Sequence, residues 1–124
     1  MQTSAYFRST DPTITFAAGE VIFSEGDPGH EMFGVLDGEV ELRRGDQLIE
    51  RLGEQGVFGE LALVDHAPRN LTAVAVADCR LAVIDEGQFL WLVHETPTFA
   101  LRIMSSLADR LRALNHPEGQ GAEA

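Results

Sequence analysis

At the centre of the chain, residues 58–73 read FGELALVDHAPRNLTA. Gly59 allows the backbone to turn tightly and to approach a ligand closely. The apolar residues after Glu60 can form one short helical turn, and the first N–H groups of such a turn can bind an anion. Arg69 adds a guanidinium group that suits a phosphate, and Glu60 can accept a hydrogen bond from a sugar hydroxyl. The block therefore predicts a site that holds a phosphate and a hydroxyl group together.

This order of residues resembles the phosphate-binding cassette of the cyclic nucleotide-binding domain family. The shared pattern is Phe-Gly-Glu, a small apolar run, a variable loop, and Pro-Arg before a strand. The resemblance extends to FAAGEVIF with the following EGD (residues 16–27) and to GVLDGEV (residues 34–40), and it covers residues 13–114. It implies that a cyclic nucleotide contacts Phe58, Gly59, Glu60, Leu61, Ala62, Arg69, Asn70, Leu71 and Arg110.

Within this resemblance, Arg69 is expected to bind the phosphate and Glu60 the ribose hydroxyl. The two residues after the arginine depart from the family pattern. The Asn70 amide could donate a hydrogen bond to the phosphate, or it could point to solvent. Leu71 lacks the hydroxyl that members selective for cyclic GMP often use to contact guanine. Cyclic AMP is therefore the expected ligand, with cyclic GMP less favoured.

Arg110 lies in the C-terminal helix, where family members often place a residue that covers the base. An arginine can stack on a purine face. The alternative is a solvated arginine paired with a nearby acid such as Glu95 or Asp109. The residues leave both readings open.

Composition limits the class of protein and its partners. A chain of 124 residues is long enough for one domain with a real core. The formal net charge is −11, and all nine basic residues are arginine, so neither nucleic acid nor an anionic membrane is an expected partner. No apolar run is long enough to cross a bilayer. Cys79 is the single cysteine, which favours a reducing cytoplasm.

Short segments rich in β-branched and aromatic residues recur at even spacing and predict strands. They lie within 14–23 and at 32–36, 40–42, 48–52, 72–77 and 80–84. Asp37-Gly38 and Ala77-Asp78 predict hairpin turns between their neighbouring strands, and Gly45-Asp46 predicts a third turn. Many short strands at even spacing indicate a sandwich or a barrel. The resemblance to the cyclic nucleotide-binding domain family implies a mainly β fold, an antiparallel β-roll (a double-stranded β-helix of jelly-roll type) with flanking helices and a C-terminal lid helix.

Two helices are expected after residue 84. Asp85 with Gln88 resembles a capping box that opens the first helix. Thr96 followed by proline opens a second helix that runs to residue 114. An apolar stripe follows at steps of four and three residues and predicts the packed face of this helix. Its members are Ala100, Met104, Leu107, Leu111 and Leu114.

The expected domain is 13–114, between an N-terminal arm (1–12) and a disordered tail (115–124). The resemblance implies that its function is the noncovalent sensing of a cyclic nucleotide, through C-terminal helix movement that reaches an unknown effector protein or a homodimer partner. Two alternatives remain open. One is a degenerate domain that serves as a protein-interaction module without ligand. The other is a cupin-like metal enzyme. It is disfavoured because the scattered histidines of this chain form no His-x-His pair. Neither catalysis nor a metal is expected.

Overall fold

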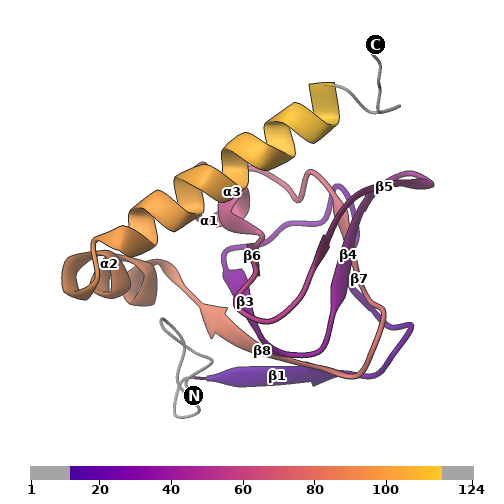
Figure 1. Cartoon of the computed structure of the whole chain (residues 1–124), viewed down its shortest axis with the longest axis horizontal. Helices are drawn as coiled ribbons and strands as arrows, with labels where there is room; N and C mark the ends of the chain where they lie inside the picture. Colours follow the sequence, from indigo (N-terminus) through magenta and orange to yellow (C-terminus); the bar gives the residue numbers. More distant parts are fainter. Residues whose placement is uncertain (1–11, 116–124) are drawn as a thin grey trace.

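Two four-stranded antiparallel sheets face each other and form the body of the protein (Figure 1). The computed structural model describes residues 12–115. The first sheet runs in the order β1 (Thr13–Phe16), β8 (Cys79–Ile84), β3 (Met32–Asp37) and β6 (Val57–Phe58). The second runs in the order β2 (Val21–Phe23), β7 (Thr72–Ala75), β4 (Val40–Arg44) and β5 (Gln47–Leu52). The predicted antiparallel β-roll is confirmed.

Strands β3 and β8 are buried on both of their faces. Alternate residues point to opposite sides of a strand. Phe33 and Val35 of β3 therefore join the core inside the roll, whereas Met32 and Leu36 join a second core under the helices. On β8, Cys79 and Leu81 join the first core, whereas Ala82 and Ile84 join the second. Burial on both faces explains why these strands read as continuous apolar runs rather than alternating ones.

The two predicted hairpins at Asp37-Gly38 and Ala77-Asp78 are wrong. Strands β3 and β8 belong to one sheet, whereas β4 and β7 belong to the other, so the chain crosses between sheets at both turns. Gly38 has a φ of +97°, and a Cβ at this position would lie 2.4 Å from the Asp78 carbonyl oxygen. Each crossing thus packs against the other. The Gly45-Asp46 turn does connect a hairpin, in which Arg44 of β4 pairs with Gln47 of β5.

Three helices lie at one end of the roll: α1 (Glu60–Val64), α2 (Glu86–Glu95) and α3 (Thr98–Asn115). Figure 1 shows α3 crossing over α1 and the strand ends, with α2 beside its first turns. The capping residue of α2 is confirmed, because the Asp85 carboxylate accepts a 2.9 Å hydrogen bond from the Gln88 N–H. None of the helices in residues 12–115 is both long and apolar enough to span a membrane.

The packed face of α3 differs from the predicted apolar stripe. The buried residues are Phe99, Ile103 and Arg110, whereas Met104 and Leu111 are 57% and 59% exposed. An arginine therefore occupies the buried face, and two apolar members of the predicted stripe lie outside it. A pattern of hydrophobic residues could not show this, because the position of Arg110 depends on acids from distant segments.

The predicted N-terminal arm and C-terminal tail lie outside the described residues, except for their inner ends at Pro12 and Asn115. The proposed domain boundaries stay predictions.

The close contact between the two crossings predicts a large cost for Gly38→Ala. A left-handed backbone costs a non-glycine residue about 1–2 kcal/mol, and the overlap with the Asp78 backbone adds to it. We expect a loss of about 3 kcal/mol or more in the free energy of unfolding, measured by urea denaturation. Gly45→Ala is the matched control. Its φ is +60° and its Cβ would meet nothing within 4 Å, so it should lose only about 1 kcal/mol. Equal losses in both variants would contradict the packing of the crossings.

Candidate ligand-binding cavity

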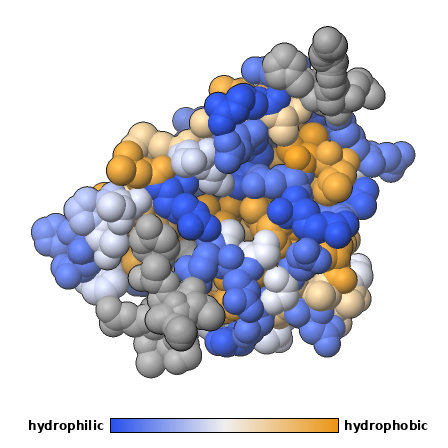
Figure 2. Space-filling view, in the orientation of Figure 1, coloured by the Kyte–Doolittle hydropathy of each residue, from blue (hydrophilic) through white to orange (hydrophobic). Residues whose placement is uncertain are grey.

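A cavity of about 300 Å³ lies between the second sheet, α1 and the C-terminal half of α3. Figure 2 shows hydrophobic surface gathered beneath the C-terminal end of α3, beside β5. The cavity has a polar side, formed by α1 and the segment after it, and an aliphatic side. Its lining residues are Phe23, Leu42, Gly59, Glu60, Leu61, Ala62, Arg69, Asn70, Leu71, Leu107, Arg110, Leu111 and Leu114.

Arg69 is a buried cation without an acidic partner. Its Nη1 donates hydrogen bonds to the carbonyl oxygens of Glu31 (2.8 Å) and Gly59 (3.2 Å). Its Nε is buried and has no partner, and across residues 12–115 no carboxylate lies within ion-pairing distance of the guanidinium. Burial lowers the pKa of Arg69 because water no longer solvates the charge, although Glu31 and Asp27 oppose the shift from a distance. The group therefore retains a donor and an unmatched charge beside the cavity.

Two glycines make room for this guanidinium. A Cβ at Gly29 would lie within 2.5 Å of Arg69 Nε, Cζ and Nη2, and a Cβ at Gly59 would lie 2.8 Å from Nη1. Gly59 also has a φ of +83°, which glycine adopts without strain, and it is the residue that precedes α1. The predicted tight turn at Gly59 is therefore present, and its close approach is to the arginine.

Glu60 opens α1 and is 1% exposed. Its Oε2 accepts a hydrogen bond of 2.7 Å from Arg110 Nη1. Burial raises the pKa of Glu60 above its ordinary value of 4.5, with a smaller contribution from Glu50, while Arg110 opposes the shift. The first side chain of the helix is thus already paired with α3.

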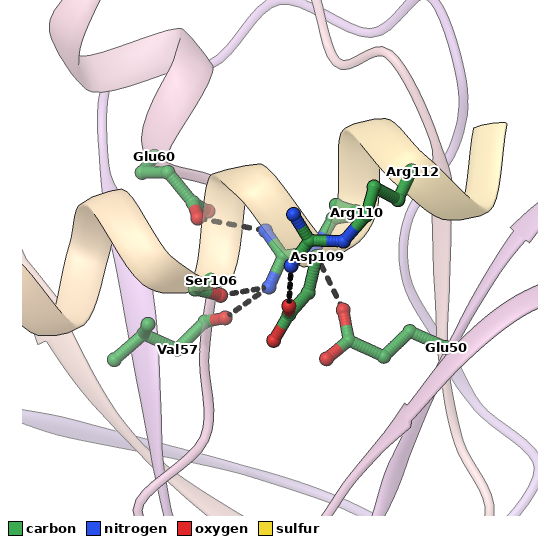
Figure 3. A network of polar contacts seen from close by, with 7 residues as sticks. All are labelled: Glu50, Val57, Glu60, Ser106, Asp109, Arg110 and Arg112. Atoms are coloured by element: carbon green, nitrogen blue, oxygen red, sulfur yellow. Dashed lines mark hydrogen bonds and ion pairs between the residues drawn. The ribbon is translucent and has the colours of Figure 1, made fainter. Parts of the chain in front are cut away.

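Arg110 connects three parts of the structure (Figure 3). Its Nε donates to Glu50 on β5 (2.7 Å), and its Nη2 donates to the Val57 carbonyl (2.8 Å) and to the Ser106 hydroxyl (2.6 Å). Burial alone would lower the pKa of Arg110, but Glu60 and Glu50 outweigh burial and raise it. The alternative of a solvated Arg110 paired with Glu95 or Asp109 is wrong, because the side chain is buried and other acids pair with it. Asp109 points elsewhere and pairs with Arg112.

The structure gathers eight of the nine predicted site residues on the cavity wall. The exception is Phe58, which is fully buried and packs against Phe23 and Phe33 behind the wall. Sequence reasoning missed Phe23 and Leu42 on the wall, Gly29 beneath Arg69, and Glu50 beside Arg110. Nothing local in the sequence marks these four residues. Phe23 and Gly29 act through Arg69, Glu50 acts through Arg110, and all of these contacts join distant segments.

The described residues hold no group of three or more histidine, cysteine, aspartate or glutamate side chains that could bind a metal ion. Cys79 is buried, and its thiol lies 3.1 Å from the carbonyl oxygens of Glu39 and Ala77. It belongs to the crossing between sheets and is not on the cavity wall.

Comparison with known proteins assigns the family. Residues 13–96 match the family model described as the cyclic nucleotide-binding domain, which is more than half of the chain. The chain therefore belongs to the cyclic nucleotide-binding domain family, and the resemblance drawn from residues 58–73 is confirmed.

Several known proteins are similar to this chain over most of its length. The CRP-like cAMP-activated global transcriptional regulator of Mycobacterium tuberculosis is 27% identical over 83% of this chain, which spans 48% of that regulator. The solved catabolite activator protein of Thermus thermophilus aligns with a TM-score of 0.70 and 30% identity, over 84% of this chain and 51% of that one. The EAL enzyme Bd1971, in its cAMP-bound form, aligns with a TM-score of 0.61 and 30% identity over 83% of this chain and 29% of that one. The chain thus spans about half the length of the first two proteins and less than a third of the EAL enzyme.

The network around Arg110 predicts a pH-dependent loss of stability in Arg110→Met. Removing one partner of a buried pair leaves an uncompensated charge on Glu60, which costs about 3–5 kcal/mol at neutral pH. The loss in the free energy of unfolding should become smaller as the pH falls towards 4.5. Glu60 then holds its proton in the folded variant, and the unfolded chain, which titrates near 4.5, begins to hold it too. As the pH rises above 4.5, the unfolded chain gives up this proton first, and the variant loses stability.

Urea denaturation of both proteins at pH 4.5 and pH 7 measures this difference. Arg112→Met is the matched control, since Arg112 pairs with Asp109 on the exposed side of the same helix and should change stability by less than about 1 kcal/mol. A loss in Arg110→Met that does not depend on pH would mean that Arg110 acts by packing rather than by charge.

Proposed function

We propose that the cavity binds a cyclic nucleotide noncovalently, with cyclic AMP preferred over cyclic GMP, and that the domain is a non-catalytic sensor. The observation that carries this proposal is Arg69, a buried guanidinium with an unpartnered Nε and no acid beside it at a cavity wall. A phosphodiester supplies the negative charge and the acceptor oxygens that this group lacks. The first N–H groups of α1, next to Gly59, favour the same anion.

The remaining parts of a cyclic nucleotide fit the rest of the cavity. Glu60 offers a carboxylate to the ribose hydroxyl beside the phosphate position. The base faces an aliphatic wall that includes Leu71, Leu111 and Leu114. The residues of this wall carry no hydroxyl group that could contact the edge of guanine. Adenine is the less polar base, so its transfer from water to an apolar wall costs less free energy. The EAL enzyme Bd1971 has been solved in cAMP-bound and cGMP-bound forms, which supports cyclic nucleotides as the class of ligand.

The response to ligand is proposed to pass through α3. This helix supplies Leu107, Arg110, Leu111 and Leu114 to the cavity wall, so its position and the shape of the site depend on each other. Arg110 shares Glu60 with the proposed ribose contact, and Glu50 can retain the arginine when Glu60 turns to the ligand. A ligand that contacts both α1 and α3 shifts the population towards the state in which the helix lies over the cavity. The proposal includes the transmission of this movement to an effector protein, a second copy of the chain or a further segment. It also includes a cytoplasmic location for the protein.

The proposal predicts that Arg69→Ala nearly abolishes cyclic AMP binding. Hydrogen bonds to a charged group contribute about 1.5–3 kcal/mol each, so losing two of them weakens binding by at least a hundredfold. Isothermal titration calorimetry of the two proteins with cyclic AMP measures the loss. Arg44→Ala is the control because Arg44 is an exposed arginine on the hairpin, away from the cavity.

Equal affinity in the wild type and in Arg69→Ala would place the ligand elsewhere. If neither cyclic AMP nor cyclic GMP binds to the wild type, the domain is a member of the family that has kept the fold without the ligand. Tighter binding of cyclic GMP than of cyclic AMP would contradict the proposal that Leu71, which lacks a hydroxyl group, disfavours guanine.

A further inference from the structure

Phe23 forms an aromatic support for the buried guanidinium. The Arg69 Cζ lies 4.2 Å from the centroid of the Phe23 ring, well within the distance of a cation–π contact. The Phe33 ring is farther away, at 5.6 Å. Phe23 itself is held by aromatic neighbours, with ring centroids 6.2 Å from Phe33 and 5.9 Å from Phe58. The ring is therefore fixed before any ligand arrives.

This contact matters because Arg69 lacks the usual means of orienting a buried arginine. A carboxylate would fix the guanidinium but would also neutralise it and occupy its donors. Here the anchoring groups are two carbonyl oxygens, both on Nη1, which leave Nε without a partner. An aromatic face stabilises a cation electrostatically and takes none of its N–H donors. Phe23 can thus hold the charge in place while the donors stay available.

We infer that Phe23 is a positioning residue for anion binding, acting through Arg69 by the electrostatic attraction between its ring face and the guanidinium. This inference rests on the proposed function, since the anion is the phosphate of the cyclic nucleotide. Phe23 also lines the cavity, and an apolar contact with the ligand would depend on the size of the side chain rather than on the electron density of the ring. The two roles make different predictions.

The first experiment compares Phe23→Leu with the wild type by calorimetric titration with cyclic AMP. Losing a desolvated cation–π contact should weaken binding by about fivefold to thirtyfold. Phe89→Leu is the matched control, since Phe89 is also a partly buried aromatic residue, but it packs against Phe99 in the core under the helices. This control should bind cyclic AMP like the wild type. A thermal melt of each variant confirms that the protein is folded at the titration temperature.

The second experiment keeps the shape of the ring and changes its charge distribution. Successively fluorinated phenylalanines are placed at position 23, ending with pentafluorophenylalanine, whose face no longer attracts a cation. Affinity for cyclic AMP should fall stepwise with the number of fluorine atoms, to about the level of Phe23→Leu. A merely structural role, or an apolar contact with the base, would leave the affinity unchanged across the series, and that result would overturn the inference.

The two failures are distinguishable. If the wild type binds cyclic AMP and the fluorinated proteins bind it with the same affinity, only the role of Phe23 is overturned. A wild type that binds neither cyclic AMP nor cyclic GMP overturns the proposed function, and the role of Phe23 in anion binding falls with it.

Discussion

The buried charge of Arg69 places more demands on the surrounding structure than any other group at the cavity. A guanidinium removed from water without an acid beside it is costly, and the fold meets that cost with carbonyl oxygens, an aromatic face and two glycines. These groups come from β2, the turn after it, and the residue before α1. The β-roll brings them together because its two sheets share one closed core. The positive site thus depends on the whole roll rather than on residues 58–73 alone.

A second arginine shows how an acidic protein organises its few positive charges. Arg110 is also buried, but it is fully paired with Glu60 and Glu50 and bonded to a main-chain oxygen. Arg69 is held without neutralisation, whereas Arg110 is neutralised and ties α3 to α1 and β5. The two cations lie on the same cavity and have opposite surroundings. Under the proposed function, this contrast assigns the anion to Arg69, whereas Arg110 connects α3 to α1 and β5.

The sequence predicted those features that depend on local chemistry. The turn at Gly59, the cap at Asp85 and most strands followed from residue type and spacing. The crossings at Gly38 and Asp78 were mistaken for hairpins because a glycine turn looks the same whether the next strand returns to its own sheet or enters the other one. The packed face of α3 was misread because a paired arginine can be buried, and only the folded chain reveals its partners. Phe23, Gly29 and Glu50 were missed for the same reason, since their contacts join segments far apart in the sequence.

Under the proposed function, the Nε–H of Arg69, which has no partner in the structure, donates a hydrogen bond to the phosphate of the nucleotide. NMR can observe this group directly. The ¹H–¹⁵N spectrum of the arginine side chains contains at most nine Nε–H signals, and the Arg69 signal is the one missing from an Arg69→Lys variant. On titration with cyclic AMP, we expect a large downfield proton shift of this signal and slower exchange with water, because the donor gains a charged acceptor. If cyclic AMP saturates the protein and the Arg69 signal does not change, Arg69 Nε is not the phosphate donor.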